Sequence, residues 1–178
     1  MTGKYIVSTL ALLISLAGGS LAAAAEATTG DQFIKEAIQG NLAEVKVGQL
    51  AQEKGASQDV KDFGNTLVND HQTANEHATE AAQKMSVTPP DKPAMKQEAT
   101  YKKLSMLSGE HFDREFIKDM VKDHQEDIAK YQQESQQSGP AAEYAKKTLP
   151  KLREHLKMAE KLERNTKVAG TASGTSRN

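Results

Sequence analysis

The chain has 178 residues, no cysteine, 26% charged residues and a formal net charge of −1. The lack of cysteine excludes disulfides, so a domain of this size must depend on its own core, which is feasible at about 150 residues. Basic residues form no cluster, which argues against nucleic-acid binding and electrostatic membrane attachment. The low aromatic content of 4% and the abundance of Ala, Lys, Glu and Gln indicate a helical protein.

Residues 1–25 have the pattern of a Sec signal peptide. Lys4 supplies the positive charge, an apolar segment follows, and small residues around Ala25 and Ala27 offer two cleavage positions. An uncleaved anchor is the alternative, but the apolar run is shorter than the ~20 residues that span a bilayer. We therefore expect a periplasmic protein with no membrane span after cleavage. The signal contains no cysteine for a lipid anchor.

Apolar residues at helical spacing predict a first pair of helices. The first covers residues 31–52, and the second begins at Ser57 or Asp59 and continues to about residue 85. Residues 87–93 contain three prolines and cannot continue a helix, so they predict an extended connection.

A short helix over residues 95–107 comes next, and a long helix then ends near residue 136. Residues 138–140, Ser-Gly-Pro, predict a turn into a last helix over residues 141–165. Pro150 cannot donate to the carbonyl of Lys146, which predicts a kink or a restart in that helix. Residues 167–178 are rich in Gly, Ser and Thr and predict a disordered tail.

Four long helices, one short helix and no credible strand predict an all-α fold, a ferritin-like four-helix bundle with a long crossover and one short extra helix. The bundle domain is expected to cover residues 30–166. The apolar residues on the helix stripes are expected to share one core, among them Phe33, Phe63, Leu67, Phe116, Met120, Leu152 and Leu162.

Three histidines are the candidate site. His71, His124 and His155 each fall on the apolar stripe of a different helix. His124 and His155 both lie ~21–23 Å from the turn that joins their helices, so they should be level. In the other hairpin Glu44 offers a fourth ligand, but its height differs from that of His71 by about 7 Å, and Asn41 matches that height better.

The histidines have two interpretations. They form either a hydrogen-bonded polar layer of the core or the ligands of a divalent transition metal. Neutral imidazole suits Zn, Cu, Fe or Ni, and the Glu44 carboxylate would broaden the choice towards iron or manganese. Asp70 and Asp123 directly precede two of these histidines, where they either orient a ring or form exposed ion pairs.

The remaining residues of interest indicate surface or packing roles rather than a site. His77 and His111 are expected on the solvated surface. Gly40 and Gly48 are expected to let a neighbouring helix approach. No nucleophile elbow or phosphate-binding glycine loop is present in the sequence, which argues against a hydrolase or a nucleotide enzyme.

Several of these motifs together are similar to those of an exported bacterial family, the domain of unknown function 4142. The similarity covers residues 30–162. It depends on the segment from Phe33 to Ala51 with Gly40-Asn41-Leu42-Ala43-Glu44-Val45, on Asp70-His71, on Phe112-Asp113 with Asp123-His124, and on Leu149-Pro150 with His155-Leu156. The resemblance implies a ferritin-like bundle without an established activity. The family label of putative outer-membrane protein is the sole basis for expecting outer-membrane association.

Classical ferritin-like di-iron proteins use a Glu-x-x-His motif on each of two helices. Three residues before His71, His124 and His155 stand Val68, Val121 and Leu152, which cannot ligate a metal.

Three functions are compatible with the sequence. The first is a non-enzymatic bundle for envelope or stress adaptation that binds Zn, Cu, Fe or Mn in its core. The second is a metal-dependent oxidase or peroxide scavenger that uses Glu44, and the missing carboxylates count against it. The third is a structural interaction protein, with a protein partner or a second copy as its partner.

Overall fold

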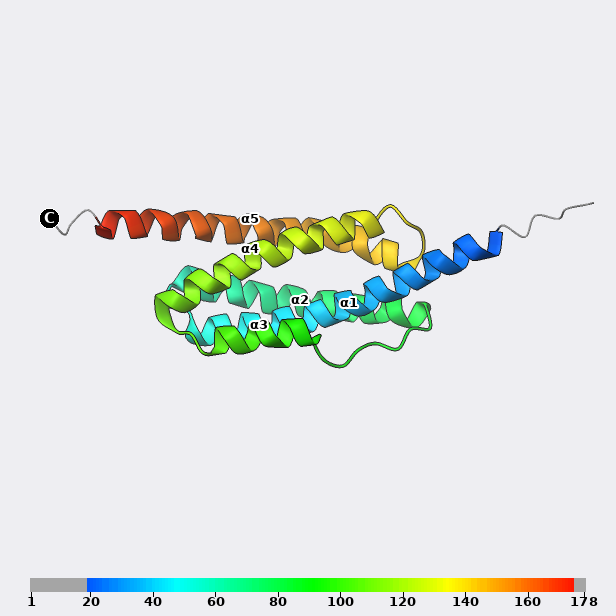
Figure 1. Cartoon of the computed structure of the whole chain (residues 1–178), viewed down its shortest axis with the longest axis horizontal. Helices are drawn as coiled ribbons and strands as arrows, with labels where there is room; N and C mark the ends of the chain where they lie inside the picture. The colour runs from blue at the N-terminus through cyan, green and yellow to red at the C-terminus, as the bar shows by residue number, and fades with distance from the viewer. Residues whose placement is uncertain (1–18, 175–178) are drawn as a thin grey trace, which may run out of the picture.

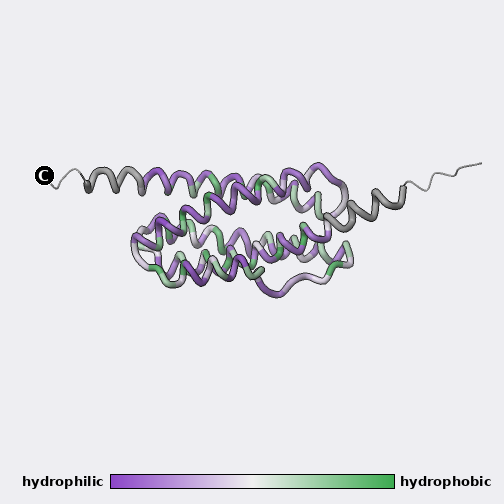
Figure 2. Tube along the Cα trace, viewed as in Figure 1, coloured by the Kyte–Doolittle hydropathy of each residue, from purple (hydrophilic) through white to green (hydrophobic). Residues whose placement is uncertain are grey.

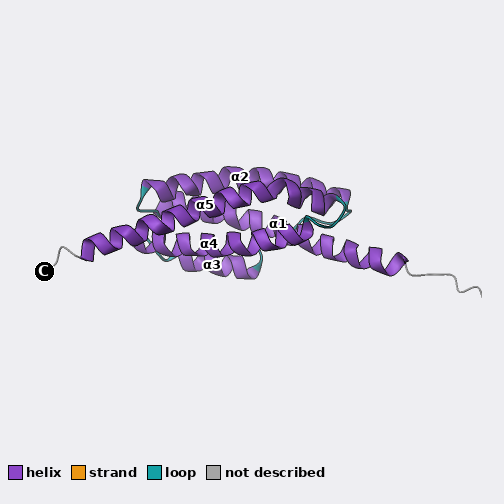
Figure 3. Cartoon of the chain, turned by 90° about the horizontal axis from the view of Figure 1, so that it is seen from above, coloured by secondary structure: helices purple, strands orange, loops and turns teal. Residues whose placement is uncertain are grey.

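The protein is all-helical, as the sequence predicts (Figure 1). In the computed structural model the backbone is described for residues 19–174 and the side chains for residues 30–166. The elements are α1 (Gly19–Lys54), α2 (Gln58–Lys84), α3 (Met95–Ser105), α4 (Gly109–Glu134) and α5 (Pro140–Gly174). The described residues form no strand, and Figure 3 shows the helices running in one general direction.

Two helical hairpins and a crossover build the bundle. α1 packs along α2, α4 packs along α5, and α2 contacts α5. Ser57 is the N-cap of α2 and its hydroxyl accepts from the backbone N–H of Val60, as the sequence predicted for this boundary. Residues 87–94 and α3 carry the chain from one hairpin to the other, and α3 lies against α1 and α4.

Small residues bring α1 and α2 together. A Cβ atom added to Gly48 would lie 2.7 Å from the carbonyl oxygen of Gly64, and one added to Gly64 would lie 2.7 Å from that of Gly48. Gly48 is thus the packing device that the sequence predicted. Gly40 is not, because a Cβ there would meet only the side chain of Gln97 at 3.7 Å.

Asp113 connects α4 to the turn between α1 and α2. Its carboxylate accepts from the backbone N–H of Ala56 at 2.8 Å and from that of Ser57 at 2.9 Å. These donors lie just before α2, where the helix leaves N–H groups without intrahelical partners. A buried carboxylate from another helix therefore fixes the start of α2.

The core consists of two apolar clusters rather than one. Phe63, Leu67, Phe116, Met120 and Leu162 belong to the first cluster, whereas Leu152 belongs to the second, against which Phe33 packs. Along each long helix the two clusters are separated by a buried polar side chain. Figure 2 shows hydrophobic and hydrophilic residues interspersed along the helices, as is typical of amphipathic helices. The expectation of a single shared core was wrong because these polar residues occupy the middle of the bundle.

Pro150 lies inside α5, where the sequence predicted a kink or a restart. The helix continues through Pro150, so the restart does not occur. Pro150 and Lys146 are both exposed, so water can bond the Lys146 carbonyl that the proline leaves without a donor. The loss of one hydrogen bond is therefore tolerated at this position.

The predicted chain ends lie partly outside the described residues. Residues 1–18 of the predicted signal peptide and residues 175–178 of the predicted tail are not described. α5 extends to Gly174, although the sequence predicted a tail without regular structure from residue 167. Extending an existing helix is easier than starting one, which accounts for the difference. Within the described part of the chain, no helix is long and apolar enough to cross a membrane.

Candidate metal centre

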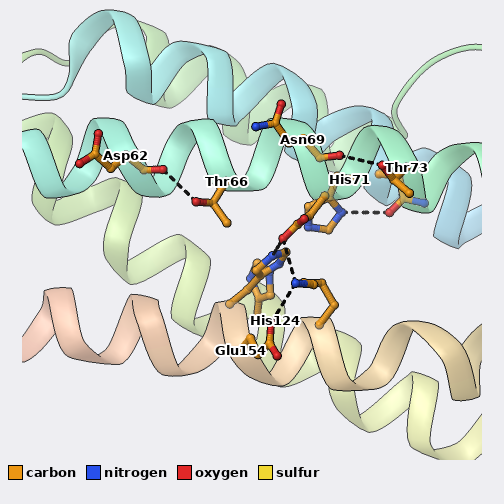
Figure 4. Close-up of polar contacts among 11 residues, drawn as sticks. Asp62, Thr66, Asn69, His71, Thr73, His124 and Glu154 are labelled. Atoms are coloured by element: carbon orange, nitrogen blue, oxygen red, sulfur yellow. Dashed lines mark hydrogen bonds and ion pairs between the residues drawn. The ribbon is translucent and has the colours of Figure 1, made fainter.

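The polar layer between the two apolar clusters contains three histidines from three helices. His71 lies on α2, His124 on α4 and His155 on α5, and they are 4%, 2% and 1% exposed. One ring nitrogen from each can be chosen so that all three lie within 4.8 Å of one another. Figure 4 shows the side chain of His71 pointing from α2 toward His124. The convergence predicted from helix register is thus observed.

Each ring is oriented by a hydrogen bond on its outer side. His71 Nδ1 donates to Asn41 Oδ1 at 3.0 Å, and His124 Nδ1 donates to the Met120 carbonyl at 2.9 Å. His155 Nε2 donates to Asp70 Oδ2 at 2.8 Å. A carbonyl or carboxylate oxygen has no proton to offer, so each neutral ring carries its proton on the outer nitrogen.

The inner nitrogen of each ring is therefore unprotonated and carries a free lone pair. These nitrogens are Nε2 of His71, Nε2 of His124 and Nδ1 of His155. The last two lie 3.3 Å apart without a proton between them, and His71 Nε2 is buried with no hydrogen-bond partner. Facing lone pairs repel, so a positively charged or electron-accepting partner at the centre would stabilise this arrangement.

A proton is a poor candidate for that partner. Burial is the main reason why the pKa of each of the three histidines is lowered, and the neighbouring rings lower those of His71 and His124 further. The pKa of His124 falls to about 4. The rings are therefore neutral near pH 7, as metal ligation requires.

The three acidic residues predicted at the site, Asp70, Asp123 and Glu44, differ in how they relate to the histidines. Asp70 orients His155, one of the two roles that the sequence allowed for it, and it also lies 3.6 Å from Lys151 Nζ. Asp123 forms no hydrogen bond with a histidine among the described residues. Glu44 is buried, but it does not belong to the set of converging ligand atoms.

Asn41, not Glu44, is the residue of α1 that forms a hydrogen bond with His71. Its Oδ1 accepts from His71, and its Nδ2 donates to the hydroxyl of Tyr144 at 3.0 Å. The Tyr144 hydroxyl lies 3.4 Å from that of Tyr131. This network fixes the orientation of His71, and the matching heights of Asn41 and His71 were its only signal in the sequence.

His77 and His111 are not part of the centre. His77 Nδ1 lies 3.9 Å from Glu80 on the surface, and Arg114 donates to His111 Nδ1 at 3.0 Å. Both positions agree with the expectation of solvated side chains.

A group of carboxylates lies beside the histidine layer, and one of them, Asp127, is expected to make the stability of the fold depend on pH. Burial, followed by the nearby carboxylate of Asp123, raises the pKa of Asp127 to about 6. Below about pH 4 Asp127 is protonated in both the folded and unfolded states, and above about pH 6 it is ionised in both. The folded state binds more protons between these values, so this group destabilises the fold as the pH rises through that window.

Asp127→Asn is therefore expected to raise the free energy of unfolding by about 1–2 kcal/mol at about pH 7.5, after allowance for the partial exposure of the side chain. The gain should disappear near pH 4. Urea unfolding at both pH values in the presence of a chelator measures it, with exposed Asp91→Asn as the matched control. A gain of equal size at both pH values would contradict the assigned pKa.

Fold and site together define the class as an all-helical bundle with a buried layer of three histidines in its centre. A family model described as "Domain of unknown function (DUF4142)" matches residues 17–162, and the chain belongs to this family. No curated protein matches the sequence.

A solved structure described as "Crystal structure of DUF305 fragment from Deinococcus radiodurans" resembles the chain with a TM-score of 0.67. The alignment covers 76% of this chain and 95% of that one. At 16% sequence identity this likeness shows a shared fold.

Proposed function

We propose that this protein binds a divalent transition metal ion in the centre of its bundle. The ligands are Nε2 of His71, Nε2 of His124 and Nδ1 of His155. The observation that carries the proposal is the meeting of three unprotonated nitrogens in a buried layer, each fixed by a hydrogen bond on its outer side.

The spacing of one pair of nitrogens supports this proposal. Zn–N bonds of about 2.0–2.1 Å at a tetrahedral angle place two ligand nitrogens about 3.3 Å apart. His124 Nε2 and His155 Nδ1 lie 3.3 Å apart. The Asp70–His155 pair also has the carboxylate–histidine arrangement that commonly orients a ligand in metal sites.

The ligand type narrows the choice of metal. Three imidazoles without a carboxylate suit zinc and copper better than manganese, which prefers oxygen. The ligand set also gives a metal-dependent oxidase of the di-iron type less support, because those enzymes need several carboxylates at the metal. We therefore favour a binding protein, and from the signal pattern we place it in the periplasm, where it would serve envelope or stress adaptation.

Calorimetric titration of chelator-treated protein with Zn²⁺ and Cu²⁺ tests the proposal. We expect one tight site per chain for at least one of the two ions. Co²⁺ provides a second readout, because nitrogen ligation in a four-coordinate site gives visible absorption bands that hydrated Co²⁺ lacks. Absence of both the tight site and these bands would favour the alternative, a polar core layer without metal.

A further inference from the structure

A cavity with acidic residues in its wall lies next to the histidine layer. It has a volume of about 310 Å³ and opens between α1, α3 and α4, and the described residues that line it include no histidine. Five carboxylates and two lysines contribute to its wall, together with apolar side chains such as Phe33 and Tyr131.

The two lysines are paired with the outer carboxylates. Lys96 Nζ lies 3.7 Å from Glu126, and Lys130 Nζ lies 3.7 Å from Glu36. The remaining carboxylates are those of Glu44, Asp123 and Asp127, and none of them has an ion pair or a hydrogen bond with a described residue. The inner part of the cavity therefore contains three carboxyl groups that form no ion pair with a described residue.

Glu44 is the one buried residue among these three carboxylates. It is 8% exposed, and its Oε2 is buried without a hydrogen-bond partner. Burial, and then the carboxylates of Asp123 and Asp127, raise its pKa. Because a buried carboxylate oxygen without a partner is strongly unfavourable, a cation in the cavity would stabilise it.

We propose that Glu44, Asp123 and Asp127 form a second cation site, separate from the histidines, that binds a hydrated divalent metal ion through oxygen. Asp123 and Asp127 are one turn apart on α4, and they line the same cavity as Glu44 on α1. Carboxylate oxygens suit Mg²⁺, Mn²⁺ or Ca²⁺, whereas the histidine nitrogens suit zinc or copper. The two sites thus select different ions.

The ion would contact part of this site through water. The three carboxylates are not close enough to form a set with oxygens within 4.8 Å of one another. Six waters at about 30 Å³ each occupy roughly 180 Å³, and the cavity has room for them. A divalent ion carries twice the charge of an ammonium group, so it stabilises the ionised form of these carboxyl groups more strongly.

Terbium luminescence tests this site without involving the histidines. Tb³⁺ prefers oxygen ligands and emits when a nearby tyrosine is excited. Tyr131 lines the cavity, and the chain contains no tryptophan that would compete as a sensitiser. We expect saturable emission from the purified protein that Mn²⁺ or Mg²⁺ suppresses and one equivalent of Zn²⁺ does not. Tyr131→Phe should reduce the emission.

Charge-removing variants assign the ligands. Glu44→Gln and Asp127→Asn are each expected to weaken Tb³⁺ binding by about tenfold or more, since affinity at oxygen sites follows the ligand charge. Glu143→Gln removes the same charge from the exposed surface of α5 and is the matched control. Circular dichroism verifies that each variant is folded.

Three results would overturn the assignment. The first is unchanged Tb³⁺ affinity in both cavity variants, and the second is an equal loss in Glu143→Gln. The third is displacement of Tb³⁺ by an alkyl diamine at lower concentration than by Mn²⁺ or Mg²⁺, which would identify the occupant as an organic cation. Each readout is independent of zinc or copper binding, so this site and the histidine centre can fail separately.

Discussion

His155→Ala is expected to weaken zinc or copper binding by about two orders of magnitude or more. Binding free energies of about 10–16 kcal/mol for four-ligand zinc sites correspond to roughly 3 kcal/mol for each ligand. His155 is central to the site because it lies 3.3 Å from the inner nitrogen of His124 and is itself oriented by Asp70. Calorimetry and competition with a chromophoric chelator measure the loss.

His77→Ala is the control for this prediction, because it removes an exposed histidine that lies outside the layer. Added imidazole should partly restore binding to the His155→Ala protein by supplying the missing nitrogen. Asp70→Ala removes the outer hydrogen bond and should weaken binding by about 10–100-fold. If His155→Ala binds the ion as tightly as the unchanged protein, the histidine layer is not the metal site.

Leu67→Ala is expected to lower the free energy of unfolding by about 2–5 kcal/mol. Leu67 is fully buried, and it belongs to the apolar cluster with Phe63 and Phe116. Truncation removes favourable burial and leaves a cavity that rigid helices close only in part. Urea unfolding of chelator-treated protein measures the change.

Leu152→Ala examines the second cluster in the same way, because Leu152 packs with residues of that cluster and is also buried. Met95→Ala is the control. Met95 is 88% exposed, so its truncation should change stability by less than about 0.5 kcal/mol. Losses below that value at both leucines would mean that the apolar stripes do not form the core.

The two proposed sites place buried polar residues in the middle of the bundle, and the stability of the fold does not require polar residues there. An apolar layer would fill this volume without buried histidines or an unpartnered carboxylate. His71, His124 and Glu44 are nevertheless buried there, between two well-packed clusters. Polar groups placed against the needs of packing are most simply explained by ligands, and this is the common basis of the two proposals.

The sequence by itself determined the helical elements and the inward faces of the three histidines. Periodicity along each helix depends only on local geometry, so the apolar stripe that contains His124 can be read without knowledge of the fold. The length of a hairpin likewise sets the relative height of two residues, which is why the levels of His124 and His155, and the match of Asn41 with His71, were predictable.

Only the tertiary structure decided which polar groups meet across helices that are not consecutive. The contact of Asp70 on α2 with His155 on α5, and that of Asp113 with the turn before α2, depend on how the two hairpins dock. The same docking places Glu44 and Asp127 in the wall of one cavity, and Glu44 is not a member of the converging histidine set. Helical periodicity places a side chain on a face but contains no information about the rotation of one hairpin against the other, and packing of the two apolar clusters sets that rotation.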